Sequence, residues 1–147
     1  MRLLFDSRWI SAHGIGRVAS EMLVRLKRDF DVVEVQAGSK PSHPLDWLRT
    51  AAELRKTDAA MFVSMGYNGS PLLGARQIFV IHDLIHLDRR GPGALTRRLY
   101  YQTVIRTAAR HATNVLTVSQ ASARRISAEW PECAGRLRVC PGLLPRN

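Results

Sequence analysis

Six short apolar runs, separated by stretches with helical or turn character, constrain what this chain can fold into. The clearest run is Gln77-Ile78-Phe79-Val80-Ile81, in which β-branched and aromatic residues follow one another without polar alternation. Such a run is typical of a strand that is covered on both faces of a sheet. The runs predicted as strands span residues 3–5, 31–35, 59–63, 77–81, 114–118 and 137–140.

Helical periodicity fills the longer segments between these runs. The predicted helices span residues 16–28, 45–56, 96–111 and 119–130. Strands and helices that alternate in this way give parallel strands joined by crossover helices. The sequence therefore predicts an α/β fold, a Rossmann-like, doubly wound parallel sheet of about six strands with helices on both faces. In the second helix, the pattern predicts that Leu48, Ala51, Ala52 and Leu54 are buried.

Length, charge and cysteine content narrow the class of protein further. The 147 residues suit one domain, and 22 Lys+Arg against 12 Asp+Glu give a formal charge of +10. That charge favours anionic partners, or it keeps an ordinary surface soluble. Cys133 and Cys140 have no metal-like spacing and are too few for a disulfide scaffold, so we expect a reducing, cytoplasmic location. No stretch approaches the ~20 apolar residues of a membrane span, and the first residues do not resemble a secretory signal.

Polar residues follow several predicted strands, where doubly wound sheets bind their ligands. Tyr67 lies after the third strand, His82 and Asp83 directly follow the fourth, and Ser119 follows the fifth. An imidazole at such an edge can hydrogen-bond a hydroxyl or take up a proton near neutral pH. Asp83 can instead begin a turn, and Ser119 is well placed to cap the next helix.

The segment His13-Gly14-Ile15-Gly16-Arg17 precedes the first predicted helix. Glycines at a helix start let a phosphate or sugar approach free backbone amides, although the loop can also need glycine torsions alone. Gly14, Gly16 and Ala19, with Glu34 further on, also match a dinucleotide-binding fingerprint. Residues 7–13 separate the strand from these glycines, which weakens that match. A dinucleotide-binding oxidoreductase domain remains the second hypothesis.

A basic, aromatic segment is the third candidate. Six arginines and two tyrosines fall between residues 89 and 110. Such a segment suits an anionic membrane surface, an acidic acceptor or single-stranded nucleic acid, and it is also typical of a solvated helix face. A non-enzymatic basic binding module is therefore the third hypothesis.

Taken in order, these segments resemble the amino-terminal domain of retaining GT-B glycosyltransferases of family 4. The resemblance runs through S-A-H-G-I-G-R, F-V-I-H-D-L-I, Y-Y-Q-T-V-I-R-T-A-A-R-H-A-T, N-V-L-T-V-S-Q-A-S and R-L-R-V-C-P-G. It implies transfer of a hexosyl or mannosyl unit from a nucleotide-sugar donor to a glycan or lipid-linked acceptor, in cell-surface polysaccharide biosynthesis.

The resemblance also assigns roles to residues. It implies that His82 faces the transferred sugar as the catalytic residue. Gly14, Gly16 and Arg17 lie near the donor phosphates and the acceptor, and Ser119 lines the crevice. Tyr67 and Asp83 complete the expected substrate-binding set, with Asp83 mainly supporting its loop.

The resemblance further implies that no cofactor or metal is needed, because cationic side chains and helix ends can stabilise the departing nucleotide diphosphate. Expected partners are the donor, the acceptor, an anionic membrane surface and a carboxy-terminal donor domain in cis or in trans, but no nucleic acid. The expected location is the cytoplasm, peripherally on the inner membrane face.

Residues 1–142 correspond to the acceptor-side domain of this family, and residues 143–147 to the start of the interdomain linker. The donor-side domain, with the paired glutamates and basic residues that bind the donor phosphates, has no counterpart in the 147 residues. We therefore expect this chain alone to have no glycosyltransferase turnover.

Overall fold

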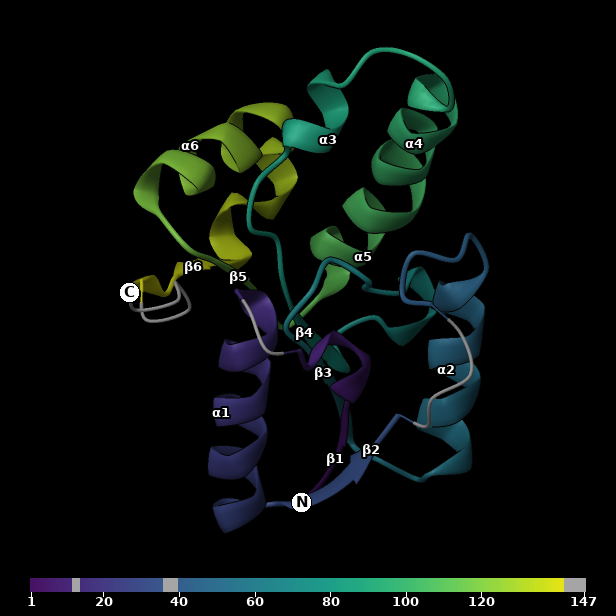
Figure 1. Cartoon of the computed structure of the whole chain (residues 1–147), viewed down its shortest axis with the longest axis vertical. Coiled ribbons are helices and arrows are strands. Elements are labelled where there is room, and N and C mark those ends of the chain that lie inside the picture. Colours follow the sequence, from purple (N-terminus) through teal and green to yellow (C-terminus); the bar gives the residue numbers. More distant parts are fainter. Residues whose placement is uncertain (12–13, 36–39, 142–147) are drawn as a thin grey trace.

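The computed structural model describes residues 1–11, 14–35 and 40–141 (Figure 1). Within these residues, all strand pairs are parallel and form one sheet in the order β2-β1-β3-β4-β5-β6. The strands of this sheet are β1 (Arg2–Phe5), β2 (Asp31–Glu34), β3 (Met61–Ser64), β4 (Gln77–Val80), β5 (Asn114–Thr117) and β6 (Leu137–Val139). The predicted parallel α/β fold is thereby confirmed, and each strand lies within two residues of its expected bounds.

Helices connect the strands, as predicted. They are α1 (Ile15–Asp29), α2 (Asp46–Lys56), α3 (Ile85–Asp88), α4 (Ala94–Tyr100), α5 (Arg106–His111) and α6 (Gln120–Glu129). The described residues also include short 3-10 helices: η1 (Ser7–Trp9), η2 (Pro71–Leu73) and η4 (Pro131–Arg136). In Figure 1, α3, α4 and the loop between them project at the top of the molecule, away from α1.

The two faces of the sheet carry different helices. On one face, Phe5 and Val80 pack with Ala19 and Leu23 of α1. Neighbouring residues alternate between the faces of a strand, so the residues next in sequence serve the other face. There Leu4 and Phe62 pack with α2, and Phe79 and Val115 pack with α5, α6 and η4. The strand order reverses between β1 and β3, which is the point where ligands bind in sheets of this kind.

The predicted helix 96–111 is longer and less regular than expected. It begins at Ala94, and a π-helical turn, η3 (Tyr101–Ile105), joins α4 to α5. The apolar spacing of this segment predicts one buried face, formed by Tyr101, Val104, Ile105, Ala108 and Ala112. All of these are buried except Val104, which is half-buried.

The predicted buried face of the second helix is partly wrong. Ala51 and Leu54 are buried, but Leu48 is 42% exposed and Ala52 is also exposed. The helix instead turns Asp46 and Thr50 inward, which a pattern based on apolar residues cannot anticipate.

No helix in the described part of the chain combines the length and apolar character that crossing a bilayer requires. The expected linker at residues 143–147 lies outside the described residues, as does its boundary at residue 142.

Candidate functional site

The carboxyl ends of the strands carry most of the predicted site residues. His82 and Asp83 follow β4, Ser119 follows β5, and Gly14 precedes α1 in the connection from β1. Because β1, β3, β4 and β5 are parallel neighbours, these residues leave the same edge of the sheet.

An apolar cluster brings three of these segments together. Ile15, Met65 and Val118 belong to one packed group on the α1 face of the sheet. Ile15 lies between Gly14 and Gly16, and Val118 directly precedes Ser119. His82 contacts the backbone of Met65. The start of α1, the end of β4 and the end of β5 therefore surround the same part of the sheet edge.

The His82 ring is fixed at one nitrogen. Its Nε2 lies 3.0 Å from the carbonyl oxygen of Met65, and the side chain is half-buried. A carbonyl oxygen can only accept, so Nε2 carries the proton and donates. In the neutral ring Nδ1 is then the acceptor, and it has no hydrogen bond to the described residues. An imidazole held in this tautomer can accept a hydrogen bond from a hydroxyl or take up its proton.

The two glycines of the α1 start serve different purposes. Gly14 is the residue before the helix, and its φ of 55° is a conformation that other residues rarely adopt. Gly16 is buried, and a Cβ there would lie 2.1 Å from the hydroxyl oxygen of Ser11. The space beside Gly16 is thus taken by the chain itself. Arg17, one residue on, is exposed, and its side chain has no hydrogen bond to the described residues.

Asp83 begins a turn, and Ser119 caps a helix. An Asp83 carboxylate oxygen accepts from the backbone amide of Ile85, at the start of α3, at 3.0 Å. The Ser119 hydroxyl accepts from the amide of Ser122 at 3.1 Å, which satisfies a free donor of the first turn of α6. The structure therefore confirms the turn predicted for Asp83 and the helix cap predicted for Ser119. Asp83 and Ser119 are both half-buried at the sheet edge.

Tyr67 makes its ring contacts with other aromatic side chains. Its ring packs edge-on against Trp9 at a centroid distance of 5.4 Å and contacts His86 and Tyr101 at 5.6 and 5.7 Å. Burial raises the pKa of its phenol. Tyr67 therefore belongs to an aromatic cluster with Trp9, His86 and Tyr101, and His82 is not among its described ring contacts.

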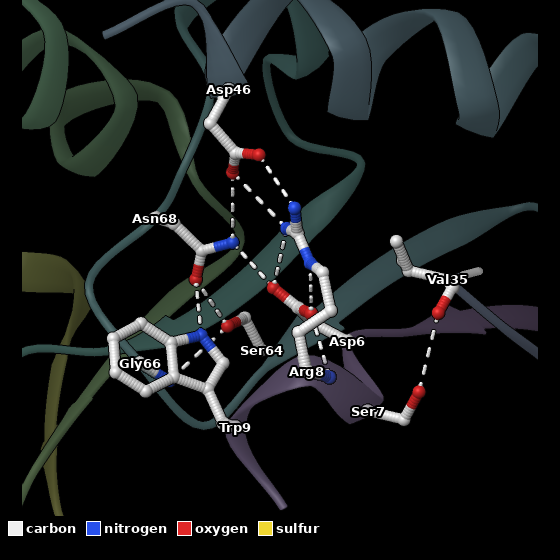
Figure 2. A network of polar contacts seen from close by, with 9 residues as sticks. All are labelled: Asp6, Ser7, Arg8, Trp9, Val35, Asp46, Ser64, Gly66 and Asn68. Carbon is white, nitrogen blue, oxygen red and sulfur yellow. Dashed lines mark hydrogen bonds and ion pairs between the residues drawn. The ribbon is translucent and has the colours of Figure 1, made fainter. Parts of the chain in front are cut away.

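Where the strand order reverses, a buried polar network occupies the sheet edge (Figure 2). The Arg8 guanidinium lies between two carboxylates, at 2.7 Å from Asp6 and 2.6 Å from Asp46. Both carboxylates are fully buried. The Asn68 amide donates to both of them, and its oxygen accepts from the Trp9 indole at 2.9 Å.

Sequence reasoning did not select this network. Burial acts to lower the pKa of Arg8, but hydrogen bonds to Asp6 and Asp46 outweigh it and raise that pKa, so the guanidinium stays charged. The four groups come from residues up to 62 positions apart, so no local spacing reveals them. The only local signal is Asp6, a charge that directly ends an apolar strand. Because each of these side chains has a hydrogen-bond or ionic partner within the network, we interpret the network as stabilising the fold.

The dinucleotide hypothesis finds little support in this geometry. The fingerprint needs a tight turn from strand to helix. Here β1 ends at Phe5 and α1 begins at Ile15, with η1 between them. Ala19 is buried in the core, and Glu34 pairs with Lys27 at 2.6 Å.

Among the residues that the structure describes, no group of three or more His, Cys, Asp or Glu side chains is arranged to hold a metal ion. No protein-family model matches the chain, and no curated protein matches it significantly. The geometry of the sheet edge and the sequence motifs are therefore the evidence for a function.

Proposed function

We propose that this chain is the acceptor-side domain of a retaining glycosyltransferase. In this proposal a sugar passes from a nucleotide-sugar donor to a glycan or lipid-linked acceptor, and a donor-side domain in cis or in trans completes the crevice. The reaction class comes from the resemblance of the sequence motifs to family-4 enzymes. The parallel sheet with ligand-competent residues along its carboxyl edge is compatible with that role.

The observation that carries the proposal is the setting of His82. Its Nε2 is held by the Met65 carbonyl, while Nδ1 is left to accept a hydrogen bond. The cluster of Ile15, Met65 and Val118 gathers the α1 start and Ser119 around the same edge. In the proposed complex, Nδ1 of His82 accepts a hydrogen bond from a hydroxyl of the transferred sugar, and the exposed Arg17 is available to a phosphate. No metal or cofactor is part of the proposal.

The test is His82→Ala in the complete enzyme, that is, this chain together with the proposed donor-side domain. Turnover of the nucleotide-sugar donor should fall by about tenfold or more, since a hydrogen bond lost from the transition state costs one or more kcal/mol. The midpoint of thermal unfolding should change little.

His111→Ala is the matched control, because His111 is exposed at the end of α5, away from the sheet edge, and should leave turnover unchanged. Equal turnover in the wild type and in His82→Ala contradicts the proposed role. Coding sequence that supplies no second α/β domain, together with no transfer by this chain, contradicts the reaction class.

An anionic membrane is the proposed second partner, with the chain acting peripherally on the cytoplasmic face. Leu95 and Leu99 on α4 are 81% and 61% exposed, one helical turn apart. Beside them, Arg89, Arg90 and Arg98 line an open hollow of about 560 Å³. Apolar side chains flanked by arginines on a projecting helix are typical of a surface that lies against anionic lipid.

A further inference from the structure

The aromatic cluster around Tyr67 forms one wall of a hollow that the site around His82 does not include. This hollow measures about 410 Å³ and lies between residues 41–44, which precede α2, and the start of α4. All three tyrosines of the chain line it, together with His86 and Arg97. Tyrosine offers a ligand both an apolar ring and a hydroxyl that can hydrogen-bond.

The aromatic walls are rigid and apolar. The rings of Tyr67, Tyr101 and His86 form a triangle with centroid distances of 5.6, 5.7 and 5.8 Å. Trp9 supports Tyr67 from behind, and its own indole is fixed by Asn68. A ligand therefore meets a preformed surface and loses little free energy in ordering it.

The same wall has polar groups with no partner. Tyr101 is 97% buried, at 3% exposure, and its hydroxyl makes no hydrogen bond with the described residues. The hydroxyls of Tyr67 and Tyr100 also have no hydrogen bond within the described chain. Burial raises the pKa of Tyr100 to about 12, so its phenol keeps its proton at neutral pH and can donate. Among the described residues, the one fully buried side-chain oxygen or nitrogen without a partner is Thr117 Oγ1. The tyrosine hydroxyls are therefore accessible, and a ligand in the hollow can hydrogen-bond to them in place of water.

Ring geometry and charge restrict the kind of ligand. The Tyr67 and Tyr101 planes meet at 34°, and those of Tyr67 and His86 at 51°, so the walls form no parallel slot for a flat base. Arg97 lies at the wall, held by a hydrogen bond of 3.2 Å from its Nε to the His86 carbonyl. None of the described residues that line the hollow carries a carboxylate. These features suit a puckered, hydroxylated ring that is neutral or carries one negative charge.

We propose that this hollow binds one pyranose ring of a glycan, as a subsite for the acceptor. The C–H face of the sugar packs on Tyr67 and Tyr101, while its hydroxyls pair with the tyrosine hydroxyls and with Arg97. The choice of a sugar rests on the proposed glycosyltransferase function. The position of the subsite rests on the hollow itself.

The test titrates this chain with three probes: methyl glucopyranoside, methyl mannopyranoside and methyl glucuronide. Binding is followed by the NMR signals of the tyrosine rings and of the Trp9 indole. At least one probe should bind saturably with a Kd of roughly millimolar, as expected for a single ring. Tyr101→Phe removes only the unpartnered hydroxyl. It should weaken binding about fivefold or more and leave the thermal midpoint unchanged, whereas a hydroxyl with a purely structural role would lower the midpoint.

Arg97→Gln should remove any preference for the glucuronide over the neutral sugars. Arg98→Gln is its matched control, because Arg98 is the next residue on α4 but lines the neighbouring hollow. Saturable binding that Tyr101→Phe weakens supports the subsite. Absence of saturable binding by all three sugars overturns it, and so does equal binding by wild type and Tyr101→Phe.

The outcome is separable from that of the proposed function. His82→Ala should leave this binding unchanged, because His82 does not line the hollow. If no sugar binds here but His82→Ala abolishes transfer in the complete enzyme, only the subsite is overturned. If sugars bind here but the complete enzyme transfers none, the subsite stands as a sugar site and the glycosyltransferase proposal fails.

Discussion

Arg8 is the residue on which the packing at the reversal point depends. Its side chain is 7% exposed and separates two carboxylates that are fully buried, Asp6 and Asp46. A buried ion pair adds little net stability compared with apolar residues, but removing one partner leaves an uncompensated buried charge. The arrangement ties the connection after β1 to the first turn of α2 and, through Asn68, to the segment after β3.

We therefore expect Arg8→Gln to lower the free energy of unfolding by about 3–5 kcal/mol, because two carboxylates are left facing each other in the interior. Urea unfolding followed by circular dichroism measures this loss. Arg2→Gln is the control: it removes an exposed pair with Asp31, and exposed pairs contribute little. Equal midpoints for wild type and Arg8→Gln would show that the network does not stabilise the fold.

At the residue scale, the sequence revealed side chains that follow strands but not the partners that reach them from elsewhere. His82, Asp83 and Ser119 were found because each directly follows an apolar run. The sequence did not predict a role for Ser11. Ser11 fills the space beside Gly16 and so explains why a glycine is needed there, but this contact forms only when the connection after β1 folds back. Tyr67 was expected beside the other site residues, yet its ring turns toward α4.

At the element scale, the helix through α4, η3 and α5 shows the limit of periodicity. Its apolar spacing predicted the buried face correctly, because Tyr101, Ile105 and Ala108 recur at intervals that suit an α-helix. The π-helical turn inserts one extra residue into the helix. This changes the apolar spacing too little for the sequence pattern to reveal it. Such turns are frequent at functional sites, and this one begins at Tyr101, in the wall of the proposed subsite.

The exposed face of α4 supports a prediction about lipid. In vesicles of phosphatidylcholine and phosphatidylglycerol, the double change Leu95→Glu and Leu99→Glu should lower the partition constant about tenfold or more, because two leucines no longer enter the interface. Thermal stability should not change, since both side chains are exposed. Sedimentation with the vesicles measures the partition constant.

The control for that experiment carries the same change of charge. Val24→Glu with Leu72→Glu also replaces two exposed apolar residues, but on α1 and η2. If both double variants lose vesicle binding equally, total charge governs the interaction and the α4 surface has no special role. Binding by neither wild type nor variants would exclude the membrane partner.

At the scale of the whole molecule, the alternation of strands and helices predicted the fold class, but it did not contain the strand order. The place of β2 outside β1, and of β6 at the far edge, follows from which face each crossover helix takes. That choice depends on apolar contacts between distant residues, such as those of Leu4 and Phe62 with Leu54. The same holds for the reversal point: the sheet edge could be anticipated, but the network that fills it could not.

The two cysteines report whether this sheet unfolds as one unit. Cys133 is fully buried in the cluster beneath α6, and burial raises the pKa of its thiol to about 11. Cys140 is half-exposed at the end of β6. With a chromogenic disulfide reagent at about pH 8, one thiol should react promptly and the other at least about a thousandfold more slowly, because Cys133 reacts only when the core opens. Cys133→Ser should remove the slow phase alone.

The slow phase then tests the cooperativity of the fold. Arg8 lies in the network between β1 and α2, on the other side of β3 and β4 from Cys133. Because the core clusters share one sheet, Arg8→Gln should accelerate labelling of Cys133 by the same factor by which it raises the unfolding equilibrium constant. An unchanged labelling rate in a destabilised Arg8→Gln variant would mean that the half of the molecule beneath α6 opens independently. In that case, the residues around His82 would lie at the boundary between two folding units.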